Sequence, residues 1–254
     1  NMHNIGLTGL ADLLQHLIVA AGFDSWVIPS VGPDYGGMMD QLPVIKELEF
    51  PTAMVLPIQF PATPSGIATG IRKFSEQLGK PIIIYIKTEN YLSVSDLKRL
   101  SDDGLLAAIK YAVPRNDPKE DDYLDSLCQT IGPMNIVSGF GERPAIDHLK
   151  TFNLAAFTSG CVCIAPTLSM NLLRAIQAEN WEEATRVHSM IMPMEDERER
   201  VSPIRVLHDA ITLCGLADMG PIYPMLSGIE KSAHDTVGKA AKELLALELD
   251  TRNI

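Results

Sequence analysis

The sequence lacks the features by which several classes of protein are recognised. Basic residues are in deficit, with 21 lysines and arginines against 32 aspartates and glutamates, and no run of them is longer than a pair. Nucleic-acid binding needs a clustered basic face, so the charge argues against it. No membrane span or export signal is visible either. The first apolar stretch, residues 10–21, is interrupted by Asp12, Gln15 and His16 and predicts an amphipathic helix.

Motifs for redox, metal and phosphate chemistry are also absent. The four cysteines, at positions 128, 161, 163 and 214, contain no C-x-x-C pair, which predicts reduced thiols in a cytoplasmic protein. The six histidines show no H-x-H or H-E-x-x-H spacing, so we expect no catalytic metal and no cofactor. The nearest approach to a glycine-rich phosphate loop, residues 139–144, lacks its third glycine, and no Walker-type motif occurs.

What the sequence does contain is a regular alternation of short apolar runs with longer amphipathic stretches. Several runs are apolar on both faces, as strands covered by helices on both sides should be. They start between 20 and 30 residues apart, which matches the ~30 residues of one β/α unit. The predicted strands are residues 25–31, 53–57, 81–86, 105–113, 135–138 and 155–159.

Helix signals lie between and after these runs. Pro64 opens a helix that ends at Gly79, Ser93 and Ser95 are candidate caps for the next one, and Pro118 is expected to start a third. After Pro166 the strands cease and a helical tail follows. The predicted helices are residues 67–78, 93–100, 118–131, 168–178, 181–192, 204–214 and 231–247.

Two architectures fit this alternation, a (β/α)₈ barrel and an open doubly wound sheet. The open sheet usually carries a glycine-rich loop after its first strand, so the absence of that loop favours the barrel. Only six strands are visible, and nothing before Ser25 resembles a strand. Either the chain shown lacks two strands or the architecture is not closed.

Lys110 is the most informative candidate for chemistry. It lies in a run that is otherwise apolar on both faces, residues 105–113. Burying an ammonium group is costly, so a lysine there tends to lose its proton, and the neutral amine is the nucleophile of Schiff-base chemistry. Alternatively, Lys110 lies at the strand end and reaches water or an acidic partner. The pattern alone leaves both interpretations open.

Two further residues lie at the end of the preceding strand. Tyr85 ends the apolar run that starts at Pro81, and a phenol beside an amine can carry protons. The same position also suits a half-buried packing residue. Lys87 shares the strand face of Tyr85 and is either an anion-binding cation or a solvated one.

A polar turn follows the predicted strand at 135–138. Ser138 and Gly139 allow close backbone approach to a ligand, and Arg143 could grip a carboxylate with two hydrogen bonds. The alternative is a tight turn with a surface ion pair between Glu142 and Arg143.

With these residues in this order, the chain resembles the dihydrodipicolinate synthase / N-acetylneuraminate lyase family of class I aldolases and dehydratases. Pro81–Tyr85 is similar to the family's fifth strand, Ala108–Lys110 to its sixth and Ile136–Gly139 to its seventh. Ala155–Gly160 fits the eighth, and the segment from Ser202 resembles the family's Asn-Pro-Ile-Pro-Val segment. The resemblance implies a (β/α)₈ barrel with a C-terminal helical extension, in which the lysine forms a Schiff base and the tyrosine relays protons.

The resemblance also indicates where this chain differs from the family. We expect the family's first two strands and its Gly-Thr-Thr loop to lie at or before Asn1 and to be missing from the chain as given. Residues 1–166 would then run from about the end of strand 2 through strand 8, and residues 167–254 would be the final barrel helix and the extension. Asn90 stands where the synthase branch has an arginine for its substrate's carboxylate, so the resemblance implies a member other than the synthase.

The predicted function is therefore that of a Schiff-base-forming lyase acting on pyruvate or another 2-oxo acid, with a sugar-derived acid as one option. Lys110 would attack the ketone and Tyr85 would move protons, while Ser138 and Gly139 line the pocket and Lys87 or Arg143 balances substrate charge. The resemblance also implies a cytoplasmic homo-oligomer, a tetramer or dimer. Two rivals are a catalytically silent binder of a 2-oxo acid and a metal-dependent barrel enzyme that would use Asp34, Glu89 and Glu142.

Overall fold

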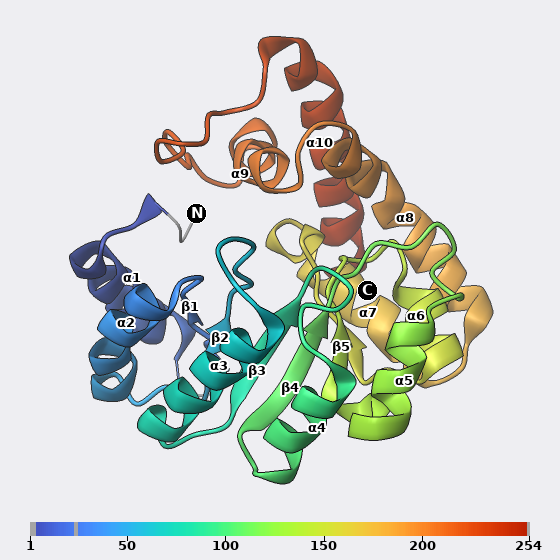
Figure 1. The fold of residues 1–254 in the computed structure, drawn as a ribbon. Helices are drawn as coiled ribbons and strands as arrows, with labels where there is room; N and C mark the ends of the chain where they lie inside the picture. The colour runs from blue at the N-terminus through green and yellow to red at the C-terminus, as the bar shows by residue number, and fades with distance from the viewer. Residues whose placement is uncertain (1–3, 23–24, 253–254) are drawn as a thin grey trace. The chain divides into compact units, whose positions relative to one another are not determined.

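A computed structural model describes residues 4–22 and 25–252 of the chain. Its strands follow one another across one sheet in chain order, β1 to β6, and alternate with helices (Figure 1). The strands are β1 (Ser30–Val31), β2 (Met54–Val55), β3 (Ile82–Ile86), β4 (Leu106–Tyr111), β5 (Ile136–Ser138) and β6 (Ala156–Phe157). Each lies within one of the six apolar runs, so all six predicted strands are confirmed.

The helices are α1 (Leu7–Ala21), α2 (Tyr35–Glu47), α3 (Pro64–Leu78), α4 (Val94–Asp102), α5 (Asp122–Ile131), α6 (Ala145–Phe152), α7 (Pro166–Gln177), α8 (Trp181–Arg200), α9 (Pro203–Leu213) and α10 (His234–Arg252). Apart from α2 and α6, for which no helix was predicted from the sequence, they lie close to the expected segments. Thr63 caps α3, Gly79 ends it in the left-handed conformation, and Ser93 caps α4. No helix of the described residues is long and apolar enough to cross a membrane.

Three predicted helix boundaries are wrong by four residues or more, and one of them is the end of the last helix, which continues to Arg252 instead of stopping at residue 247. The fifth helix begins at Asp122 rather than at Pro118, because Asp121 accepts a hydrogen bond from the Leu124 N–H and so caps the helix four residues later. The predicted end at Met192 is also wrong, since α8 continues through Pro193 to Arg200. Residues on both sides of Pro193 are buried, and this packing outweighs the hydrogen bond that the proline removes.

The chain divides into two compact units, one up to Val137 and one from Ser138, with the boundary inside β5. In the first unit β1, β2, β3 and β4 are paired in parallel, and α2, α3, α4 and α5 pack side by side in chain order (Figure 1). The division predicted at residues 166 and 167 separates the strands from the helical tail, and it stays a prediction.

In the second unit α7, α8, α9 and α10 pack on one another. Glu248 of α10 is fully buried and accepts hydrogen bonds at 3.0 Å from the backbone N–H groups of Thr167 and Leu168 in the first turn of α7. Burial raises the pKa of Glu248, but these bonds and the Arg252 guanidinium outweigh burial and leave the pKa lowered. The first turn of α7 is therefore capped by a side chain from the last helix.

Candidate functional site

Tyr85 and Lys110 lie opposite each other on adjacent parallel strands. The register of β3 and β4 pairs Tyr85 with Lys110 directly. Successive side chains of a strand point to opposite faces, and burial follows this alternation. The isoleucines on either side of Tyr85 are fully buried, as are both neighbours of Lys110, whereas Tyr85 and Lys110 themselves are half-buried. The two side chains therefore share the more accessible face of this strand pair.

The amine of Lys110 lies over the Tyr85 ring. Its Nζ atom is 4.5 Å from the ring centroid, and the Nζ of Lys87 is 5.9 Å from the same centroid. Both distances are within the ~6 Å at which a cation is attracted to an aromatic face. Lys87 is exposed and Lys110 is half-buried, so one phenol ring has both a half-buried amine and a solvent-exposed cation near it.

The hydroxyl of Tyr85 keeps its proton at neutral pH. Burial raises the pKa of Tyr85 above its ordinary value of 10.0, because a phenolate would lose solvation there. A protonated phenol can give its proton to an oxygen that gains charge during a reaction, and can take one back afterwards.

The segment after Lys110 is anchored on the opposite face of the sheet. The Tyr111 hydroxyl donates to Asp121 Oδ2 at 2.6 Å, and Arg115 donates to Asp121 Oδ1 at 2.9 Å and to Glu89 at 2.7 Å. Burial raises the pKa of Asp121, but its hydrogen bonds from Arg115, Tyr111 and the Leu124 N–H outweigh burial and lower the pKa overall. The residue next to Lys110 is thus bound to an ionised, buried carboxylate.

The other predicted binding residues lie in the second unit. Ser138 is fully buried, its hydroxyl forms a 2.9 Å hydrogen bond with His148 Nδ1, and its carbonyl accepts from the Thr158 N–H. Gly139 is half-buried. Arg143 is exposed and pairs with two carboxylates of α8, at 2.5 Å from Asp196 and 2.9 Å from Glu199.

Glu142, the neighbour of Arg143, belongs to a buried polar cluster that the sequence did not predict. Its side chain is fully buried, with one oxygen accepting hydrogen bonds from the hydroxyls of Ser159 and Ser169 and the other lacking a hydrogen-bond partner. Burial and the nearby Glu195 raise the pKa of Glu142, against the opposing effect of the two serines. The surface ion pair between Glu142 and Arg143 is therefore not formed.

The same cluster is the group of potential metal ligands found among the described residues. Glu142, Cys161 and Glu195 each place one ligand atom within 4.8 Å of the others. Arg198 is already hydrogen-bonded to Glu195, and Cys161 donates its thiol proton to Glu195 at 3.1 Å. Arg198 pairs with Glu195, and the raised pKa of Glu142 favours the protonated, uncharged form of that carboxyl group. The three residues are far apart in sequence, which is why no spacing motif indicated them.

The acidic residues of the predicted metal-dependent alternative have other partners. Asp34 caps α2 by accepting from the Gly37 N–H at 2.7 Å, and Glu89 pairs with Arg115. Both lie in the first unit, whereas Glu142 lies in the second. These contacts give Asp34 and Glu89 structural roles.

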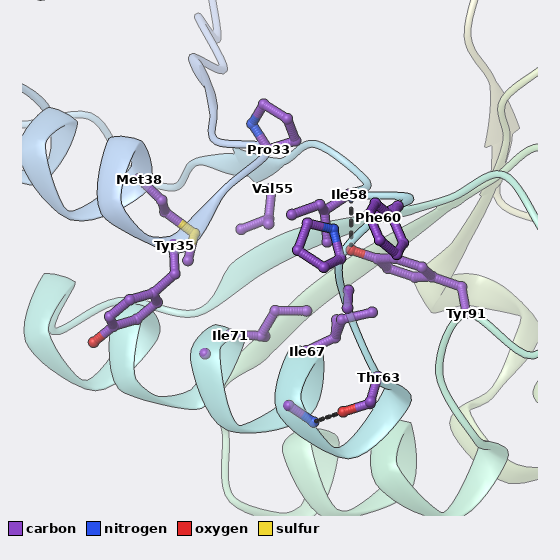
Figure 2. Close-up of a pocket in the computed structure, with 14 residues that line it drawn as sticks. Pro33, Tyr35, Met38, Val55, Ile58, Phe60, Thr63, Ile67, Ile71 and Tyr91 are labelled. Atoms are coloured by element: carbon purple, nitrogen blue, oxygen red, sulfur yellow. Dashed lines mark hydrogen bonds between the residues drawn. The ribbon is translucent and has the colours of Figure 1, made fainter.

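An apolar cavity of about 580 Å³ opens in the first unit, between α2, α3 and the loops that follow β1, β2 and β3 (Figure 2). Tyr91 reaches into it, and its hydroxyl accepts a hydrogen bond from the Ile58 N–H at 3.4 Å. None of the fourteen lining residues carries a charge. A 2-oxo acid would find no cation there for its carboxylate, which distinguishes the cavity from the Tyr85–Lys110 face.

Known structures show what this fold is similar to. Dihydrodipicolinate synthase from Oceanobacillus iheyensis matches 99% of this chain and 81% of its own, with 19% identity and a TM-score of 0.82. The synthase from Bacillus clausii matches 100% of this chain and 82% of its own, with 18% identity and a TM-score of 0.83. A prophage protein of the same family from E. coli K12, crystallised with pyruvate, matches 96% and 83%, with 16% identity and a TM-score of 0.80.

These matches confirm the fold prediction. The chain has the (β/α)₈ barrel fold of the dihydrodipicolinate synthase proteins, with its six strands in barrel order. No protein-family model matches the sequence, and no curated protein matches it by sequence. The likeness therefore concerns the arrangement of the chain in space.

The lowered pKa of Asp121 predicts a pH-dependent stability. A carboxylate whose pKa is lower in the folded protein stabilises it fully at pH values above the unfolded pKa, which is ordinarily 3.8, and this contribution is lost as the pH falls through the folded pKa. Asp121→Asn should lower the free energy of unfolding by about 1–3 kcal/mol at pH 7, because Arg115 and Tyr111 lose a charged acceptor. The difference from wild type should shrink below pH 3.8.

Urea denaturation at a series of pH values measures this difference, with the exposed neighbour Asp122→Asn as the control. A change that is equal for the two variants, or independent of pH, would contradict the role of Asp121.

Proposed function

We propose that the protein is a lyase of the dihydrodipicolinate synthase / N-acetylneuraminate lyase family that forms a Schiff base between Lys110 and a 2-oxo acid. The observation that carries the proposal is the placement of the Lys110 amine over the Tyr85 ring, on adjacent strands in register. Support comes from the fold, which is that of the synthases, and from a protein of that fold crystallised with pyruvate. Pyruvate is the simplest member of the proposed substrate class.

The first steps require an amine and a proton carrier. The neutral Nζ of Lys110 attacks the ketone carbon, forming a carbon–nitrogen bond while the proton lost by nitrogen is delivered to the carbonyl oxygen through the Tyr85 hydroxyl. A second proton from Tyr85 lets the new hydroxyl leave as water, which gives an iminium. The raised pKa of Tyr85 supports this role, since the hydroxyl holds its proton until an oxygen in the reaction takes it.

The iminium then accepts an electron pair from the substrate. In cleavage, the carbon–carbon bond beyond the α-carbon breaks, the departing hydroxyl-bearing carbon becomes an aldehyde, and its proton passes to the tyrosinate. In dehydration, the tyrosinate takes a proton from the α-carbon, and the resulting enamine expels the hydroxyl group of the next carbon as water with the proton returned by Tyr85, which leaves a conjugated iminium. After cleavage, the remaining enamine is protonated at carbon. On both branches hydrolysis of the iminium returns Lys110 to its free amine.

A cation near the same ring can neutralise the negative charge of the substrate's carboxylate. Lys87 is exposed and 5.9 Å from the Tyr85 centroid, so it is our first candidate for the carboxylate of the substrate. The resemblance to the family's seventh strand covers Ser138 and Gly139, and the sequence itself marks Arg143 as a candidate partner for a carboxylate, so we propose binding roles for all three. Arg143 already pairs with two carboxylates of α8, so we assign it a secondary role in binding the substrate's carboxylate.

Trapping with borohydride tests the Schiff base. Incubation of the protein with pyruvate and borohydride should add one reduced pyruvate per chain, located at Lys110 by peptide mass spectrometry. The Lys110→Ala variant should give no adduct, and Lys98→Ala, which removes an exposed lysine on α4, should react like wild type. A folded wild-type protein that traps neither pyruvate nor longer 2-oxo acids would instead support the catalytically silent binder.

Removal of one hydroxyl tests the proton relay. Tyr85→Phe keeps a ring beneath the Lys110 amine but cannot carry a proton, so adduct formation should slow by about 10² or more. Tyr91→Phe removes the hydroxyl of a buried tyrosine that lines the apolar cavity and should leave the rate unchanged. Adduct formation is measured in trapping reactions that are stopped at a series of times. Equal rates for the two variants would show that Tyr85 has no part in the mechanism.

A further inference from the structure

Helix α8 carries a buried pair of charged side chains in the interior of the second unit. Glu195 and Arg198 are hydrogen-bonded to each other one turn apart, and their side chains are only 4% and 14% exposed. The loops that they reach follow two successive strands, Gly139–Pro144 after β5 and Thr158–Gly160 after β6. In this fold, ligands are bound by the loops at the carboxyl ends of the strands.

Two glycines show how closely the pair approaches these loops. A Cβ atom on Gly160 would lie 2.4 Å from the Arg198 Cζ, and one on Gly141 would lie 2.7 Å from a Glu195 carboxylate oxygen. Side chains could not occupy these positions without displacing the pair. Gly141 also has a φ of +83°, a conformation that residues with a side chain rarely adopt. Both loops are therefore shaped around the pair.

Other side chains of α8 hold the same loop from outside. His188 Nε2 lies 3.1 Å from the carbonyl oxygens of Glu142 and Arg143, and Asp196 and Glu199 accept from the Arg143 guanidinium. Together with the buried pair, these contacts fasten the loop after β5 to the helix along three turns of α8.

We propose that Glu195 and Arg198 are positioning residues, which fix the loops after β5 and β6 in the geometry that binds the 2-oxo acid. This inference rests on the proposed function, in which Ser138 and Gly139 take part in binding. A buried ion pair is a poor way to gain stability, because apolar side chains of similar volume do as well or better. The planar fork of a guanidinium does, however, define distance and direction, and an error of 1 Å in a binding loop can cost about 10² in activity.

The same helix supplies a matched control. Glu197 and Arg200 form a second pair with the same spacing, but the Arg200 side chain is 54% exposed and touches Thr236 rather than a strand-end loop. Arg198→Gln and Arg200→Gln therefore each remove one guanidinium group from the same helix. Only Arg198→Gln removes a guanidinium that lies against the loops after β5 and β6.

Hydrogen–deuterium exchange of the whole chain tests the positioning without any assumption about activity. Arg198→Gln should speed exchange of the amides in residues 139–145 and 158–163 by about tenfold or more, since local opening becomes easier. Arg200→Gln should leave them at the wild-type rate. Arg198→Lys keeps the charge without the fork, and it should show the same local increase with an unchanged midpoint of urea unfolding. Wild-type exchange in Arg198→Lys, or the same increase in Arg200→Gln, overturns the proposal.

Pyruvate trapping then tests the consequence for binding. For Arg198→Lys the pyruvate concentration that half-saturates adduct formation should rise about tenfold, while the maximal rate at Lys110 stays within about twofold of wild type. A fall in the maximal rate alone contradicts a positioning role. If wild-type protein traps no 2-oxo acid, the proposed function fails and so does the claim that these loops serve binding, and the exchange contrast still shows whether the pair holds them.

Discussion

The chemistry proposed for this protein depends on the register between β3 and β4. This register places Tyr85 beside Lys110, and the amine then lies 4.5 Å from the ring centroid. Both residues belong to strands whose opposite faces are filled by fully buried side chains, so neither can change face without exposing that core. The amine and the phenol are held together by the fold itself, and the chemistry proposed for the pair follows from that placement.

The two units hold the segments that follow their strands by similar means. Beyond Lys110 the chain is anchored by Asp121, which receives hydrogen bonds from Tyr111, Arg115 and its own helix. In the second unit the loops after β5 and β6 are held by Glu195 and Arg198 of α8. Both devices use a buried carboxylate and an arginine where apolar packing would have given stability as readily. What such pairs add is a defined geometry for the backbone that they hold.

Sequence reasoning found the strands because buried parallel strands are continuous apolar runs, and it found Lys110 because a charge inside such a run is conspicuous. Helix ends were predicted where a glycine ends the helix, as at Gly79, and were missed where a proline suggested a boundary that a cap or packing decides, as at Asp121 and Pro193. The cluster around Glu142 could not be predicted, because its members come together only through tertiary packing. In the sequence, the cluster is reflected in Gly141 and Gly160, where a side chain would collide with Glu195 or Arg198.

The central claim is that Lys110 is the nucleophile, and a crystal soaked in pyruvate tests it most directly. The account predicts continuous electron density from the Lys110 Nζ to the second carbon of pyruvate, with the Tyr85 hydroxyl within hydrogen-bond distance of the reacting group. Pyruvate bound elsewhere, or bound beside Lys110 without a covalent link after prolonged soaking, would contradict the Schiff-base mechanism.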